Sequence, residues 1–574
     1  MTKKKRARQR DQRNNKRGKL LVYVLLVLVA LSFRVAVARF LPNDSPDDGR
    51  VYDQIARNLL EQHVFSHDSE PPFAPSLIRM PGYPLFLAGV YSVSNHGNKT
   101  AVRIFQALMD TATCALIALV AFLWEPDESR KGRSSIAAFA LAAVCPFTTI
   151  YVATILSETP TMFFAIGMTL TATLALKTSN RRKAVSLWFA TGVLAGVAVL
   201  LRPDSGLFAL ALGLTLVVAT LARAGELELS ARRKETLLRT VRTCYLGAVL
   251  SVAFCLVLVP WAIRNYRVFH LFQPLSPAHA EMPGEFVPRG YLTWVRTWID
   301  DGRYIGPTIW QLDSGPIKLE NFPDRAFDSS EERQRVSALL EKYNHPPEEP
   351  ELFTDEPKSS PASPEDQAKQ EEQDQADKPG GDQADEQDGD EGDGKDDEEG
   401  DTDESAAADE GQDQAVEMTP EIDAGFAQLA RERINHHPFR YYVWLPLKRA
   451  RTLWVDTHSD YYPFQGELLP LEDLDYDGHQ QYFLPAFAAL TLIYSLLGIA
   501  GGWFLWQTGN FMARIWVLLA ALMIFLRLGF FSSLENPEPR YMVEAFPFLC
   551  LLGGLALGRL PGLMKKIWSR LTPD

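Results

Sequence analysis

The chain has 574 residues, of which 47% are hydrophobic, and it carries a formal net charge of −13 at pH 7. Its apolar residues are concentrated in runs of membrane length, so the composition excludes a single soluble core and predicts a multi-pass membrane protein. The negative charge lies in one tract: residues 348–417 contain 29 Asp and Glu against four Lys, and without them the formal charge would be about +12. The rest of the chain is therefore basic, as is usual for cytoplasmic loops beside anionic lipid.

The N-terminal segment 1–19 is strongly basic and precedes an apolar run from Leu20 to about Leu41. No small-residue cleavage site closes this run, and it is long for the apolar core of a signal peptide. We therefore expect a retained first membrane helix with its basic end in the cytoplasm. A nucleic-acid-binding arm is the less favoured alternative, and no nucleic acid partner is expected.

Further apolar spans follow, and basic flanks recur on one side of the membrane, which satisfies the positive-inside rule. The expected fold is an all-α multi-pass membrane protein with about ten transmembrane helices, an external α-rich region and a disordered acidic insertion. The spans are expected at about 20–41, 102–124, 134–153, 159–176, 184–201, 206–221, 246–263, 483–506, 515–531 and 541–557. The expected division of the chain is a cytoplasmic tail (1–19), an N-terminal transmembrane module (20–263) with an external active-site loop (42–101), an external region (264–347), a disordered acidic linker (348–417), external juxtamembrane helices (418–482), C-terminal transmembrane helices (483–560) and a second cytoplasmic tail (561–574).

The stretch 47–87, DDGRVYDQIARNLLEQHVFSHDSEPPFAPSLIRMPGYPLFL, holds a carboxylate pair, a short amphipathic helix and a Pro-Gly-Tyr-Pro corner at the expected outer membrane surface. Asp48 and Tyr52 are four residues apart, which places them on one face of a helix. An Asp near a helix start also serves as an N-cap, so that structural reading remains open for Asp48. Asp47 and Asp53 are rival carboxylates, because a shift of register would promote either.

This stretch resembles the first external loop of the GT-C glycosyltransferases, in particular the family-39-like enzymes related to protein O-mannosyltransferases and the lipid A aminoarabinose transferase. The resemblance rests on the Asp48-to-Tyr52 spacing, on IARNLL, VFS and RMPGYPLF in that order, and on PWAIRNYRVF and ENPEPRYMVEAFPFL further along. It covers roughly 18–279 and 431–560. It implies that Asp48 is the catalytic general base, which takes a proton from an acceptor hydroxyl, and that the sugar carbon is inverted.

The resemblance also implies a lipid-phosphate donor, and arginine presents a fixed fork of donors that matches phosphate oxygens. For each arginine, anchoring at the membrane interface is the alternative. Glu158, in LSETP, is a candidate for the donor pocket, or else a carboxylate that complements the helix dipole. The expected substrate-binding residues are Tyr52, Arg79, Tyr83, Glu158, Arg202, Arg264 and Arg540. Arg103 and Asp110 are seven apart on the second span, and we expect them to form an internal charge pair.

The acidic tract has almost no large apolar residues and should be disordered, because it cannot bury enough surface to offset its ordering entropy. It lacks the spaced ligands of a calcium loop. No metal site is expected, since adjacent His436 and His437 point apart on a helix, although assistance by a divalent metal stays open and no cofactor is assigned. The five Cys all fall in or beside apolar spans, so no disulfide framework is indicated.

No Walker-type phosphate loop and no G-x-G-x-x-G motif occurs, which favours a lipid-linked donor over a nucleotide-linked one. Together with these absences, the resemblance implies a hexosyl- or pentosyltransferase that moves a sugar from a polyprenyl-phosphate donor to a hydroxyl of a protein, lipid or glycan, on the outer face of a plasma or inner membrane. The alternatives are a transporter or lipid-handling permease, for which no internal repeat is evident, and an inactive scaffold.

Overall fold

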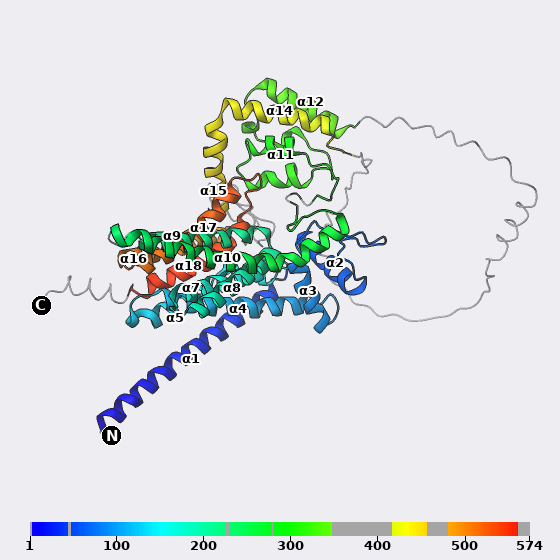
Figure 1. Ribbon diagram of the computed structural model, residues 1–574. Helices are drawn as coiled ribbons and strands as arrows, with labels where there is room; N and C mark the ends of the chain where they lie inside the picture. The colour runs from blue at the N-terminus through cyan, green and yellow to red at the C-terminus, as the bar shows by residue number, and fades with distance from the viewer. Residues whose placement is uncertain are drawn as a thin grey trace, which may run out of the picture.

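The computed structural model describes residues 3–43, 47–224, 229–277, 279, 281–346, 416–455 and 480–560. These residues form helices joined by loops, and no strand occurs among them beyond an isolated bridge between Asn43 and Thr154. Figure 1 shows a layered bundle of membrane-length helices, with α11, α12, α14 and α15 gathered beside it. The expected all-α fold is confirmed, with a further α-rich region, the external region, beside the bundle. The expected disordered acidic linker falls almost wholly outside the described residues.

The helices of the N-terminal module are α1 (Lys3–Phe40), α2 (Asp47–Glu61), α3 (Gly82–Val93), α4 (Lys99–Trp124), α5 (Glu128–Ala143), α6 (Pro146–Thr149), η1 (Ile150–Val152), α7 (Glu158–Lys177), α8 (Arg181–Leu201), η2 (Pro203–Ser205), α9 (Gly206–Ala224) and α10 (Leu229–Phe269). The later helices are α11 (Arg289–Arg296), α12 (Ser330–Asn344), α14 (Pro420–His436), η7 (Arg440–Trp444), α15 (Leu445–Val455), α16 (Gln480–Gln507), α17 (Phe511–Ser532), η9 (Pro539–Ala545) and α18 (Phe546–Leu557), with short turns η3 to η6 between α11 and α12.

The described helices account for most of the about ten membrane spans that the sequence predicts. Within the described residues, eight helices are long and apolar enough to cross a membrane, or nine if the pair α5 and α6–η1, bent by 52°, is one span. Pro146 stands at the bend, where a missing N–H favours interruption of a helix. The span expected at 206–221 corresponds to a shorter apolar helix, Pro203–Ala219.

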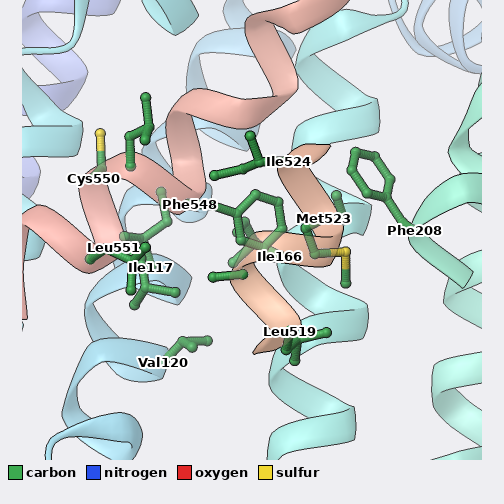
Figure 2. Packing of buried hydrophobic residues seen from close by; sticks show 14 of the residues in the cluster. Ile117, Val120, Ile166, Phe208, Leu519, Met523, Ile524, Phe548, Cys550 and Leu551 are labelled. Carbon is green, nitrogen blue, oxygen red and sulfur yellow. The ribbon is translucent and has the colours of Figure 1, made fainter. Parts of the chain in front are cut away.

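The bundle core is built where helices distant in the sequence meet. Figure 2 shows Ile117 and Val120 of α4, Ile166 of α7, Leu519 and Met523 of α17 and Phe548 and Leu551 of α18 packed together. Close approach needs small residues: a Cβ at Gly501 of α16 would lie 1.9 Å from the Leu552 carbonyl oxygen of α18. Small residues serve membrane helices in this way because packing, and not water exclusion, drives their association.

A buried ion pair joins α1 to α4. Arg34 Nε lies 2.7 Å from Asp110 Oδ2, with both side chains almost fully buried. Arg34 also donates to the Ala142 and Ala143 carbonyls at the C-terminal end of α5. Asp110 is therefore paired with Arg34, and the expected pairing with Arg103 is wrong: Arg103 donates to the Ala153 carbonyl at 2.9 Å.

The external helices α11, α12 and α14 share a second core, in which Trp294 and Phe426 are fully buried. Within it, Arg433 of α14 lies 2.9 Å from Glu332 of α12. The ends that flank 347–415 lie side by side, because Lys342 Nζ of α12 is 2.9 Å from Glu421 Oε1 of α14. α15 then continues to the bundle, where it packs against α17.

Candidate functional site

The candidate site is centred on Asp48, in the first turn of α2. Its Oδ1 lies 2.8 Å from Arg79 Nη2, which comes from the loop between α2 and α3. Its Oδ2 lies 3.0 Å from Arg540 Nη2 of η9, near the other end of the chain. The carboxylate is thus held between two guanidiniums, whereas a simple helix cap would bond only to main-chain N–H groups of its own helix.

A second carboxylate shares Arg540. Glu538 Oε1 lies 2.6 Å from Arg540 Nε, and the Glu538 side chain is only 4% exposed. Burial raises the pKa of Glu538 to about 7; Arg540 opposes this shift, and the nearby charges of Asp48 and Glu158 add to it. The site therefore contains two carboxyl groups with different proton affinities.

Asp48 itself is strongly acidic. Burial alone would raise its pKa, but the charges and hydrogen bonds of Arg540 and Arg79 lower that pKa to about 2. Asp48 is therefore ionised at neutral pH. Its basicity depends on how tightly the two guanidiniums hold it.

Tyr52 and Tyr83 form the aromatic wall of this loop. Their ring centroids lie 5.1 Å apart in an edge-to-face arrangement, and the Tyr83 hydroxyl donates to Gln106 Oε1 of α4 at 2.9 Å. Burial raises the pKa of Tyr52 to about 12, with a further contribution from the charge of Asp48. The four-residue spacing of Asp48 and Tyr52 places them on one helical face, as expected.

Arg202 and Glu158 belong to a neighbouring network of buried charges. They form an ion pair with each other, and Arg202 Nε lies 3.2 Å from Asp204 Oδ1. Arg527 Nη2 of α17 lies 3.0 Å from Glu544 Oε2 of η9, and Arg527 also pairs with Asp204. Tyr541 connects the two groups of charges, since the guanidiniums of Arg202 and Arg540 lie 5.7 and 5.3 Å from its ring centroid.

Arg264 makes contacts of another kind. Its Nη1 donates to the Ser76 carbonyl at 2.7 Å, and its guanidinium lies 5.0 Å from the Trp261 ring centroid and 5.4 Å from that of Phe65. These contacts tie the end of α10 to the loop that carries Arg79. The geometry favours a role for Arg264 in ordering that loop.

Of the two rival carboxylates, Asp47 and Asp53, the structure describes the side chain of Asp53 alone. Asp53 accepts hydrogen bonds from the Tyr91 hydroxyl and, at 3.0 Å, from Arg57 Nε, so it fastens α2 to α3. The side chain of Asp47 lies outside what the structure describes. Among the described side chains, no group of three or more His, Cys, Asp or Glu has a geometry that would hold a metal ion.

Sequence reasoning missed several charged members of the site. Arg527 and Glu544 lie inside apolar spans, where an ionisable residue is a functional candidate by default, so a signal was present. Glu538 gave no such signal, because it stands in the polar run ENPEPR. The residues not expected were Asp204, Arg527, Glu538 and Glu544.

The fold and the site define a multi-pass helical membrane protein with a charged site where the first loop meets the C-terminal helices. Residues 24–275 match the family model described as dolichyl-phosphate-mannose-protein mannosyltransferase. This match confirms the resemblance to the family-39-like GT-C glycosyltransferases. It covers Asp48, Tyr52, Arg79, Tyr83, Glu158, Arg202 and Arg264, and Arg540 lies beyond it.

Two solved structures are similar to the chain. One is an oligosaccharyltransferase of Archaeoglobus fulgidus tethered to an acceptor peptide with an NVT sequon, with 11% identity, a TM-score of 0.43 and coverage of 96% of this chain and 51% of that one. The other is ArnT of Cupriavidus metallidurans bound to undecaprenyl phosphate, with 14% identity, a TM-score of 0.30 and coverage of 97% and 81%. The chain thus spans about half the length of the archaeal enzyme it matches. A comparison with curated proteins gave no match.

Proposed function

We propose that this protein is a membrane glycosyltransferase that moves a sugar from a polyprenyl-phosphate donor to a hydroxyl group on the outer face of the membrane. The observation that carries the proposal is the placement of Asp48 between Arg79 and Arg540. One carboxylate and two guanidiniums supply both functions that the reaction needs, a proton acceptor and a cradle for a departing phosphate. The match to the mannosyltransferase family model supports this assignment.

In the proposed reaction, Asp48 takes the proton of the acceptor hydroxyl. The acceptor oxygen forms a bond to the sugar's anomeric carbon, while the bond from that carbon to the phosphate oxygen breaks. The electron pair leaves with the polyprenyl phosphate, and Arg79 and Arg540 stabilise its added negative charge. Inversion at the sugar carbon is what the family resemblance implies.

The low pKa of Asp48 fits this sequence of events. A carboxyl with a pKa of about 2 is a weak base as long as both arginines hold it. A donor phosphate competes for the same guanidinium N–H groups, and its arrival would draw them from Asp48. Because Asp48 is partly buried, loss of these partners would raise its pKa and increase its basicity. Donor binding would therefore activate the base.

The remaining candidates have roles consistent with their contacts. We propose that Tyr52 and Tyr83 bound the sugar site and that Arg202, held by Glu158, faces the donor from the side of Tyr541. Arg264 would act by ordering the loop of Arg79. Location in a plasma or inner membrane with the N-terminus in the cytoplasm is part of the same proposal.

The test is sugar transfer from a panel of radiolabelled polyprenyl-phosphate sugars in proteoliposomes, with the intact chain compared with Asp48→Asn and Arg79→Ala. We expect transfer to collapse in Asp48→Asn while donor binding survives, and donor binding to weaken in Arg79→Ala. If the intact protein consumes no donor, or if Asp48→Asn stays fully active, the proposal fails and the transporter alternative gains support.

A further inference from the structure

The turn between α17 and η9 is held from outside the membrane bundle. It begins after Ser532 and leads through Glu535 to Glu538 and Arg540; Glu538 pairs with Arg540, and Arg540 contacts Asp48. The turn is short, and its Glu535 side chain is 10% exposed. Small displacements of the turn would therefore be transmitted to Arg540.

Arg296, at the end of α11, is the first contact from the external region. Its Nη2 and Nε lie 2.6 and 3.0 Å from the same oxygen, Glu535 Oε2. A guanidinium that donates twice to one carboxylate fixes both distance and direction, and partial burial limits competition from water. The pair joins α11 to the turn.

Arg449 of α15 braces the same junction. It is almost fully buried, and its guanidinium donates to three main-chain carbonyls: Ile299 at 2.8 Å, Ser532 at 3.4 Å, and Arg296. It thus links the external chain directly after α11 with the last residue of α17. Because α15 also packs against η9, three contacts from the external region converge on the segment that carries Arg540.

We infer that the Arg296–Glu535 ion pair, braced by Arg449, is a latch through which the external region fixes the position of Arg540 and so sets the affinity of the site for the donor phosphate. Arg296, Arg449 and Glu535 are then positioning residues, since they act through Arg540. This inference rests on the proposed function in one respect, that Arg540 binds the phosphate.

The test measures binding of a polyprenyl phosphate to the full-length protein in nanodiscs, together with the donor and acceptor KM values in sugar transfer. Glu535→Gln and Arg296→Ala should each weaken polyprenyl phosphate binding about tenfold, or about 1.4 kcal/mol. They should raise the donor KM and leave the acceptor KM unchanged. The matched control is Arg335→Ala, which removes an Arg–Glu pair of the same region, 2.7 Å to Glu432, that lies on the surface away from the turn. This control should bind as the wild type does.

Charge reversal separates the latch from general damage. Arg296→Glu combined with Glu535→Arg should bind polyprenyl phosphate more tightly than either single reversal. Should Glu535→Gln fail to fold, Glu535→Asp, which keeps the charge but shortens the reach, should show the same loss of binding. Wild-type affinity in the folded variants, or no recovery in the double reversal, would overturn the latch.

Arg540→Ala distinguishes this failure from failure of the proposed function. If Arg540→Ala abolishes binding while the latch variants bind normally, only the latch is wrong. If Arg540→Ala itself binds normally, the assignment of Arg540 to the phosphate is wrong, and the latch inference falls with it.

Discussion

Arg540 Nη2 lies 3.0 Å from Asp48 Oδ2, although 492 positions separate the two residues in the sequence. The contact closes the first external loop against the segment that precedes the last described helix. Asp48 lies in the part of the chain that matches the mannosyltransferase family model, and Arg540 lies outside it. The charged site is therefore complete only when both ends of the chain are assembled.

Asp48→Asn should reduce sugar transfer about 10²- to 10⁴-fold, the usual effect of removing a general base. Donor binding should persist, because the asparagine side chain has nearly the same size and both arginines remain. Initial rates of transfer at saturating donor would measure the loss. The matched control is Asp53→Asn, which alters a carboxylate five residues along the same helix that bonds to Tyr91 and Arg57. A larger loss in Asp53→Asn than in Asp48→Asn would transfer the base assignment to Asp53.

Arg540→Ala and Arg264→Ala should separate phosphate binding from loop ordering. Arg540 contacts the two site carboxylates and is proposed to hold the donor phosphate. Its removal should therefore weaken donor binding about 10-fold or more, as expected for loss of a charge-assisted hydrogen bond. Arg264 bonds to loop carbonyls, and its removal should mainly lower the thermal midpoint. Equilibrium binding and thermal unfolding in detergent would report both effects. Equal donor affinities for the two variants would contradict this division.

The affinity for a singly charged polyprenyl-phosphate sugar should decrease as pH rises through about 7. Below this value Glu538, whose pKa is raised to about 7, is protonated and neutral; above it, the Glu538 carboxylate competes with the donor phosphate for Arg540. The added negative charge of Glu538, beside Arg540, should weaken donor binding about fivefold, or about 1 kcal/mol. Binding measured between pH 6 and pH 8 should show this change in the wild type and a flat profile in Glu538→Gln. A matching slope in both proteins would exclude Glu538 as its source.

Arg527→Ala should destabilise the bundle strongly. Arg527 is fully buried and pairs with Glu544 and Asp204, so its removal leaves two carboxylates without that counter-charge. Breaking a buried pair from one side costs about 3–5 kcal/mol. Thermal unfolding in detergent is the measurement, and the control is Arg514→Ala on the same helix, whose side chain is exposed. Similar midpoints for the two variants would show that the pair contributes little to stability.

The sequence predicted the membrane helices well, because twenty or so apolar residues are a strong local signal. It was less informative about α5 and α6, where the apolar run continues through a 52° bend at Pro146. The expected span at 206–221 coincides with α9 (Gly206–Ala224), and the described apolar helix there is Pro203–Ala219. Hydropathy reports composition, and it does not report where a helix bends or how deep it lies.

Part of the candidate site was recognisable from the sequence. The spacing of Asp48 and Tyr52 can be seen within one short stretch of sequence. The same is true of the position of Arg79 near the end of the loop between α2 and α3. Which distant arginine meets Asp48 depends on how α2 and η9 assemble, and no local pattern contains that information. The same holds for Asp110, whose partner is Arg34 on another helix and not Arg103 on its own.

The side-by-side ends of α12 and α14, joined by Lys342 and Glu421, bear on the evolution of the chain. The described parts of α12 and α14 are thus held together by their own side chains. Each doubling of the length of such a connection costs only about 0.6 kcal/mol of closure entropy. The position between α12 and α14 is thus one where the length of the connecting chain can change while the helices on either side keep their places, since their own side chains hold them together.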